Sequence, residues 1–172
     1  MKKFFLLALA VFIGVIILLP KENLYYSAEK AFAPMHLFLD DEDIHNRLIY
    51  LDVCDATLLF DSIEIGSIEK IRLTAFVFYN QVSIQSINFN KQFSMLFPDK
   101  IDYLTFTYSI LHPLSINIEG KGGFGPVYGK IDLYDGSMKL FFTPSREMRR
   151  YPLLLAKLYK SEGELVYETH VK

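Results

Sequence analysis

Residues 120–127 come closest to a motif that does chemistry. They spell Gly-Lys-Gly-Gly-Phe-Gly-Pro-Val, which fits the glycine-rich loop over the ATP phosphates of protein kinases. A kinase also needs a strand lysine, a catalytic aspartate and a metal-binding aspartate in a far larger domain. A dinucleotide loop needs a helix directly after it, whereas a strand pattern containing Gly129 follows here. We therefore expect these glycines at a sheet turn or bulge, where the backbone takes positive φ or passes close to another element.

The other side chains that could hold a metal or act in catalysis are scattered. The four histidines are His36, His45, His112 and His170. They lie in different segments without metal-ligand spacing, and no serine or acidic pair has a catalytic surround. The acidic run at residues 40–43 lacks the glycine turn of a calcium loop, so it predicts a solvated loop or a helix N-terminus. The sequence predicts no catalytic residue, no cofactor and no metal site; an enzyme whose site assembles only in three dimensions stays open.

Cysteine content and net charge further restrict the possible classes of protein. The single cysteine, Cys54, excludes an internal disulfide, and its strand-like surroundings predict a small buried side chain. The formal net charge of −2 gives no general attraction to nucleic acid. With 172 residues, 51% of them hydrophobic, the chain is long enough for one domain with a core.

The first twenty residues carry a membrane signal. Lys2 and Lys3 precede an apolar run over residues 4–19, which Pro20 closes. As a helix the run would reach about 24 Å, against the ~30 Å of a bilayer core. The charged and bulky residues that follow do not suit signal peptidase, so we expect an uncleaved anchor; a cleaved secretory signal is the alternative. The paired lysines place the N-terminus in the cytoplasm and the rest of the chain on the outer side of the membrane.

Downstream of the run the pattern indicates a short helix and then a sheet. Helical spacing over residues 23–32 predicts a juxtamembrane helix, with Tyr25 and Tyr26 near headgroup level. From Arg47 onward the apolar period becomes two, as in half-buried strands. We thus expect an anchor at 1–20, a juxtamembrane helix and acidic linker at 21–46, and a periplasmic β-rich domain at 47–172.

Nine segments of the β-rich domain have a strand pattern. They are residues 48–53, 57–65, 71–79, 82–89, 103–110, 114–118, 127–133, 138–142 and 164–170. The apolar phase slips between Ile84 and Ile87, which predicts a bulge or break near residues 85–86. Asp135-Gly136 between two alternating runs predicts a hairpin. The expected fold is mainly β with a little α: an N-terminal transmembrane helix, an antiparallel β-meander sheet and one C-terminal helix.

Two surfaces are candidates for binding lipid or a partner. Residues 75–79 are apolar on both faces, so Phe76, Phe78 and Tyr79 predict a strand covered on both sides, by protein, lipid or a partner. The C-terminal helix, capped by Ser145 and interrupted by Pro152, carries Arg149 and Arg150. These arginines suit lipid headgroups or an acidic partner, although a solvated helix face is the commoner explanation of such a pattern.

The order of these features resembles a known family. A short anchor ends in Leu-Pro, a Leu-Tyr-Tyr segment follows it, and a glycine-rich stretch at residues 122–125 runs into Tyr-Gly-Lys-Ile at 128–131. This arrangement resembles the type II secretion system protein N family and, more distantly, AsmA-like periplasmic β-domain proteins. The resemblance implies a single-pass inner-membrane protein of a Gram-negative bacterium, with its β-domain in the periplasm, that assists the secretion apparatus. No site residues follow from it.

Three functions remain after the sequence. The leading one is a non-enzymatic scaffold of a type II secretion apparatus, held in the inner membrane by residues 4–20, whose open strand edges contact other envelope or secretion proteins. The alternative is an AsmA-like lipid-binding or lipid-transfer module, in which the segment around Phe76 and Phe78 lines a groove for acyl chains. An exported enzyme is the third.

Overall fold

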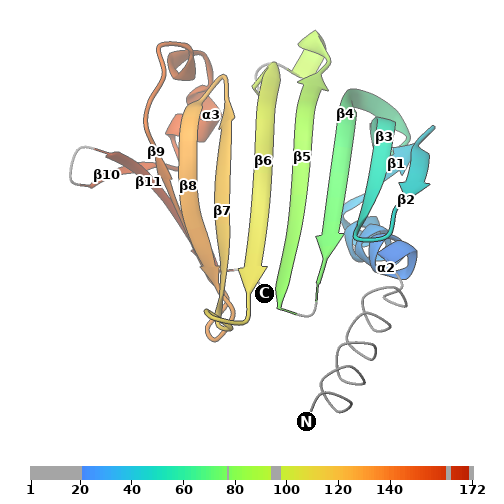
Figure 1. Cartoon of the computed structure of the whole chain (residues 1–172). Coiled ribbons are helices and arrows are strands. Elements are labelled where there is room, and N and C mark those ends of the chain that lie inside the picture. Colours follow the sequence, from blue (N-terminus) through green and yellow to red (C-terminus); the bar gives the residue numbers. More distant parts are fainter. Residues whose placement is uncertain (1–20, 77, 94–97, 162–163, 171–172) are drawn as a thin grey trace.

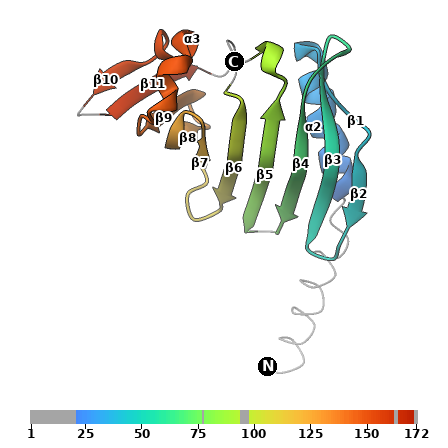
Figure 2. The same ribbon diagram turned by 90° about the horizontal axis from the view of Figure 1, so that it is seen from above.

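The chain forms a single antiparallel sheet of 11 strands with short helices on it (Figure 1). The structure is a computed structural model, and it describes residues 21–76, 78–93, 98–161 and 164–170. The expected mainly β, antiparallel fold is therefore confirmed for these residues. Viewed from above, β10 and β11 run across the direction of β5 and β6, so the sheet is strongly twisted (Figure 2).

The elements follow one another with short connections. The strands are β1 (Leu37–Asp40), β2 (Asp43–Asn46), β3 (Tyr50–Phe60), β4 (Ile63–Ala75), β5 (Tyr79–Phe89), β6 (Lys100–Ser109), β7 (Ser115–Gly122), β8 (Gly125–Asp132), β9 (Ser137–Phe142), β10 (Tyr159–Ser161) and β11 (Glu164–His170). The helices are α2 (Lys21–Phe32), η1 (Ala33–Met35), η2 (Lys91–Phe93), η3 (Glu147–Arg150) and α3 (Pro152–Leu155).

The strand order is that of a meander with modified ends. Strands β3 to β9 pair in sequence order, β11 joins β9, and β10 lies outside β11. At the other end β1 and β2 pair with successive halves of β3. Residues 21–46 were expected to be a helix and a linker, and they contribute these two strands to the sheet. The acidic residues 40–43 span the connection between β1 and β2 and are largely exposed, as a solvated loop.

One face of the sheet is apolar and the other is polar. Two rows of apolar side chains cross it, one through Leu51, Leu73, Val82, Phe106, Ile118 and Leu140, the other through Val53, Ile71, Ile84, Leu104, Val127 and Phe142. Residues paired across antiparallel strands point to the same side, so both rows lie on one face, which we call the apolar face. The alternation expected for residues 103–110 is confirmed by this register.

A crease crosses the sheet where the alternation slips by one residue. Four aligned positions are left out of the pairing: Asp55, Glu69, Ser86 and Asp102. Asp55 and Ser86 have φ of 55° and 53°, in the left-handed region that Asp tolerates better than most residues. Because every crossing strand slips at the same line, apolar residues three apart still share the apolar face. The irregularity predicted near residues 85–86 is confirmed.

The crease also explains a wrong strand boundary. The sequence predicted separate strands at residues 48–53 and 57–65, but β3 runs unbroken from Tyr50 to Phe60, and the chain turns at Asp61 and Ser62. Residues 54–56 interrupt the alternation without reversing the chain. Cys54 lies here on the polar face, half-buried, so the prediction of a buried thiol is wrong.

Both turns predicted from glycine are confirmed. Residues 120–127 form the hairpin between β7 and β8, where Gly125 has φ of 97° and an added Cβ would meet the carbonyl oxygen of Thr143 at 2.3 Å. The Asp135-Gly136 pair closes the β8–β9 connection: Gly136 has φ of 71°, and the Asp135 carboxylate accepts a hydrogen bond from the Ser137 amide. The backbone geometry of the two turns therefore explains these glycines.

Helical segments cover the two ends of the apolar face. Tyr25 of α2 packs with Leu51, Val53 and Ala56 of β3. Near the other end Met148 of η3 packs with Phe124, Val127 and Phe142. Tyr25 is thus a core residue, 6% exposed.

The expected C-terminal helix is two short turns. The Ser145 hydroxyl accepts the amide hydrogen of Met148, so the predicted cap is confirmed. The sequence placed Pro152 as a break or restart, and α3 begins there but ends at Leu155. Among the described residues no helix is long and apolar enough to cross a membrane, and the expected span at residues 4–20 lies outside them.

Candidate functional site

Among the residues that the structure describes, no helix covers the middle of the apolar face. Half-buried apolar side chains there belong to β5, β6 and β7: Val82, Ile84, Leu104, Phe106, Tyr108 and Ile116. We call this set the central strip. The core clusters that include α2 and η3 side chains do not include the central strip. Ile84, at the border of the strip, packs against a third cluster around Ile87, which Phe93 of η2 also contacts. Within the part of the chain that the structure describes, the strip is therefore a band of apolar surface between two covered ends.

The dimensions of the strip suit extended hydrocarbon. Three neighbouring strands span about 10 Å from first to last, and the four steps from Leu104 to Tyr108 extend about 13 Å along the strand. Ile118 and Ile87, at its borders, are 3% and 7% exposed, so the surface beside the strip is closed core. An acyl chain laid along the strands would contact side chains that already form a continuous apolar surface.

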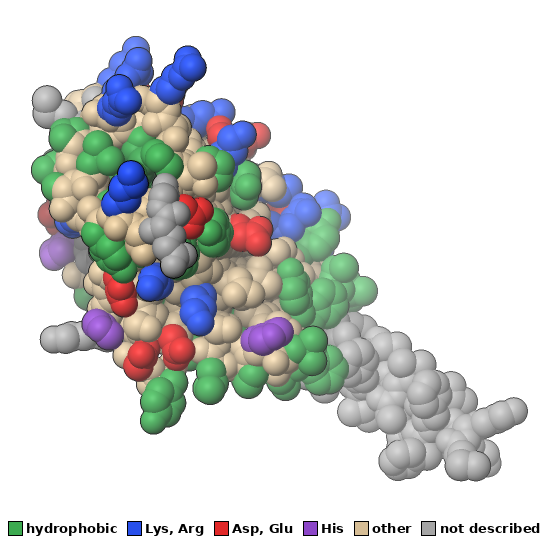
Figure 3. Space-filling model, turned by 90° about the vertical axis from the view of Figure 1, so that its left-hand side faces the viewer, with side chains coloured by type: hydrophobic (Ala, Val, Ile, Leu, Met, Phe, Trp, Pro, Cys, Tyr) green, Lys and Arg blue, Asp and Glu red, His purple; other side chains and the backbone are tan. Residues whose placement is uncertain are grey.

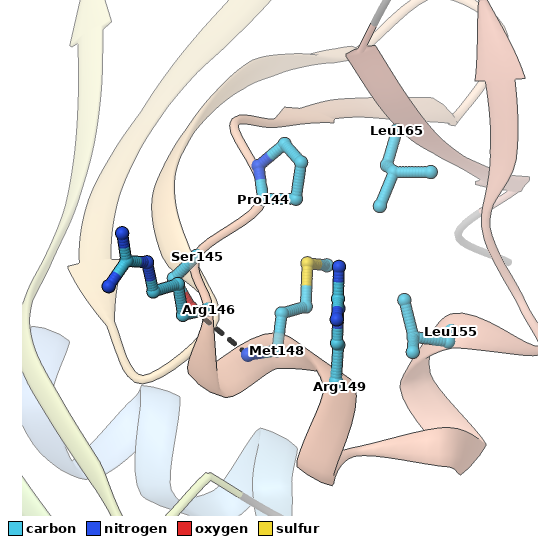
Figure 4. A pocket seen from close by; sticks show the side chains of 7 residues that line it. All are labelled: Pro144, Ser145, Arg146, Met148, Arg149, Leu155 and Leu165. Carbon is cyan, nitrogen blue, oxygen red and sulfur yellow. Dashed lines mark hydrogen bonds between the residues drawn. The ribbon is translucent and has the colours of Figure 1, made fainter.

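An open pocket of about 560 Å³ lies at one end of this face. Figure 4 shows Met148, Leu155 and Leu165 around it, with Arg149 beside Met148 and Arg146 directed away. Leu165 pairs with Phe142, so this wall of the pocket belongs to the apolar face. A pocket lined by both apolar and polar side chains, with a guanidinium at its side, can accept a molecule that has a hydrocarbon part and an anionic head.

The structure divides the predicted surface residues between two places. Phe76, Phe78 and Tyr79 lie at the turn between β4 and β5, where the Phe76 amide donates to the Tyr79 carbonyl oxygen at 2.9 Å. The predicted strand with two apolar faces is therefore wrong, because a tight turn needs no cover on both sides. Arg149 and Arg150 lie on η3, at the opposite end of the sheet, and only Arg149 lines the pocket.

The sequence did not indicate the central strip, although it predicted the strands that carry it. The alternation at Leu104 and Phe106 showed which side chains share a face, but not which part of that face the helices leave open. That depends on where α2 and η3 dock, and no local pattern encodes the docking. The pocket residues Met148 and Leu155 belonged to the apolar stripe of the expected helix, where a core role was the natural interpretation.

The most concentrated charge cluster lies on the polar face and is closed. Asp52 is 7% exposed, and its carboxylate accepts hydrogen bonds from Arg72 Nε at 2.7 Å and from Arg72 Nη2 at 2.9 Å. Lys70 Nζ lies 3.0 Å from Asp52 Oδ2, and the Arg72 guanidinium stacks 4.3 Å over the Tyr50 ring. The hydrogen bonds from Arg72 lower the pKa of Asp52. Because its oxygens are paired in this way, we assign the Asp52 carboxylate a role in stabilising the fold.

Neither a metal site in the described residues nor a similarity to known proteins indicates a function. No group of three His, Cys, Asp or Glu side chains suited to a metal ion occurs among residues 21–76, 78–93, 98–161 and 164–170. Comparison with protein-family models, with curated proteins and with solved structures finds no match to this chain. The fold and site define a class only: an open antiparallel sheet with an apolar face that helices cover at its ends.

Proposed function

We propose that this protein is a non-enzymatic module of the cell envelope that holds an acyl chain on the apolar face of its sheet. The central strip carries this proposal, since it offers half-buried Val82, Ile84, Leu104 and Phe106 as one surface with no helix over it among the described residues. Residues 4–20 would anchor the chain in the inner membrane, with the sheet in the periplasm. The pocket beside Arg149 would be a separate place for an anionic group, because buried Val127 and Phe142 lie between it and the strip.

Native mass spectrometry of the full chain extracted from its membranes tests this proposal. Phe106→Gln places an amide in the middle of the strip, and Thr105→Gln makes the matched change on the polar face of the same strand. We expect stoichiometric phospholipid or fatty acid on the wild type and on Thr105→Gln, and its loss from Phe106→Gln. Circular dichroism verifies that both variants fold. Absence of bound lipid from the wild type, or equal lipid on both variants, would contradict the proposal.

A second function is supported by the outer edge of the sheet. Strand β10 pairs only with residues 164–166 of β11, so Tyr167 to His170 have no second partner strand among the described residues. An open edge of this kind can accept a strand from another protein. It supports the alternative of a scaffold in a type II secretion apparatus.

A photocrosslinking amino acid at the exposed His170 tests the scaffold function. We expect it to yield a discrete adduct with a secretion-apparatus subunit, whereas the same group at exposed Asn117, within the sheet, should not. No adduct, or equal adducts at both positions, would contradict a partner strand at this edge.

A further inference from the structure

The hairpin turns at one end of the sheet carry exposed apolar side chains. The register aligns Tyr50 with Thr74, Tyr79 with Ser109, and Ser115 with Asp132, so the adjoining turns share one end. Their exposed apolar residues are Leu48, Ile49, Phe78, Tyr79, Ile110, Leu111, Leu114, Leu133 and Tyr134. We call this set the apolar rim. In Figure 3 hydrophobic side chains protrude along the lower edge, where these turns lie.

The degree of exposure excludes a role in the core. Leu111 is 81% exposed and Tyr134 is 87% exposed, each at the tip of its turn. One such residue would be ordinary, but four neighbouring turns with the same character form an extended apolar edge. An edge of this kind indicates contact with an apolar partner.

The opposite end of the sheet differs in composition. Its described turns contain Asp61 and Ser62 after β3, and Lys91 and Gln92 after β5, all exposed. The arginines of η3 also lie at this end, beside the β7–β8 hairpin. The two ends therefore differ in degree. Phe60 and Ile63 are exposed beside the β3–β4 turn and Leu153 is exposed on α3, but the turns of the rim carry more exposed apolar side chains.

The position of α2, at which the described residues begin, indicates that the apolar partner is a membrane. Asn46 lies beside the β2–β3 turn of the rim, and its side-chain amide donates to the Glu22 carboxylate at 2.9 Å. The first turn of α2 is thus at the rim end of the sheet (Figure 1). In the sequence the apolar run at 4–19 ends two residues before Lys21. The expected membrane span and the rim therefore meet at the same end of the molecule.

We infer that the apolar rim rests in the interfacial layer of the bilayer that the anchor crosses. Leucine and isoleucine side chains on the turns would enter the acyl boundary, and Tyr79 and Tyr134 suit the headgroup level that tyrosine favours. Tyr108 and Ile116 form the end of the central strip that lies next to the rim. A lipid could therefore pass from the bilayer to the apolar face without crossing water. This inference rests on the membrane anchoring proposed above, and not on lipid binding by the strip.

Depth-dependent fluorescence quenching of the full chain in phosphatidylcholine vesicles tests the inference. The environment-sensitive dye NBD is attached at Leu111→Cys or Tyr134→Cys, in a Cys54→Ser background. The controls carry it at Lys121→Cys or Arg150→Cys, at the polar end. We expect nitroxide-labelled lipids to quench the rim positions several-fold more strongly than the controls, with emission shifted to the blue.

The outcomes separate this inference from the proposed function. Rim quenching no greater than at Lys121, in protein that stays with the vesicles, would overturn the inference alone. Extraction of the full chain from the vesicles by carbonate would overturn the anchoring and the inference with it. Loss of bound lipid in Phe106→Gln with unchanged rim quenching would leave the inference in place.

Discussion

Arg72 on β4 holds Asp52 on β3 through two hydrogen bonds, Nε to Oδ1 at 2.7 Å and Nη2 to Oδ2 at 2.9 Å. The two residues are direct partners in the register of the sheet. This fork joins the strands opposite the point where α2 packs on the apolar face, because Leu51 and Val53 flank Asp52 and contact the α2 cluster. The pair therefore stabilises the part of the sheet on which the N-terminal helix docks.

Replacement of Arg72 by methionine should destabilise the protein by about 1–2 kcal/mol, because it leaves Asp52 with Lys70 as its remaining partner. Urea unfolding measures the loss. Lys130→Met is the control, since the exposed Lys130 faces the same side and makes no ion pair within the described residues. Equal losses in the two variants would show that the fork adds nothing.

The fork also predicts a dependence of stability on pH. The pKa of Asp52 is lowered in the folded protein by the hydrogen bonds from Arg72. The folded state therefore binds the proton more weakly than the unfolded state. The stabilisation is present above the unfolded pKa of about 3.9 and is lost as pH falls from there through the folded pKa.

Asp52→Asn checks this linkage. Its deficit in unfolding free energy relative to the wild type should be largest near pH 6 and should shrink as the pH falls below about 4. A deficit that stays constant over this interval would mean that the charge of Asp52 does not contribute.

The crease predicts opposite effects for two substitutions at Ser86. Its φ of 53° is unfavourable for a β-branched side chain, so Ser86→Val should cost about 1–2 kcal/mol. Ser86→Gly should be neutral or slightly stabilising, since glycine adopts this conformation freely. Ser83→Val, in the regular part of the same strand, is the control for thermal unfolding and should be tolerated. A well-tolerated Ser86→Val would rule out a left-handed residue at the crease.

Gly129 predicts a steric effect within the sheet. A Cβ at this position would lie 2.1 Å from the Lys139 carbonyl oxygen and 2.9 Å from Leu140 Cα. Gly129→Ala should thus force β8 and β9 apart and cost about 1–3 kcal/mol. Lys130→Ala, at the next residue of the strand, should change the unfolding free energy far less. Similar values for both would show that β9 does not approach Gly129 so closely.

The regular strands could be predicted because alternation is a local property. Leu104 and Phe106 in β6 and the Asp135-Gly136 turn carry their own signals, and the structure confirms them. Strands β1, β2 and β10 have three or four residues each, too few for a period of two to stand out. Their place depends on long partners such as β3, which the local sequence does not name.

The site could be predicted less well, since it depends on what is left uncovered. The apolar run around Phe76 and Phe78 predicted a binding surface, but these two residues lie at a turn. Val82 and Phe106 had ordinary strand patterns, and only the positions of α2 and η3 set them apart. Of the crease, the sequence showed only the phase slip between Ile84 and Ile87. Its alignment across four strands can be seen only from the pairing of the strands.

The most direct test of the central claim is photolabelling of the full chain in membranes with a fatty acid that carries a diazirine on its chain, followed by peptide mapping. The account predicts that label concentrates on Val82, Leu104 and Phe106, and spares Ser83 and Thr105 on the polar face of the same strands. Label confined to residues 1–20, or divided equally between the two faces of β5 and β6, would contradict an acyl chain held on the apolar face.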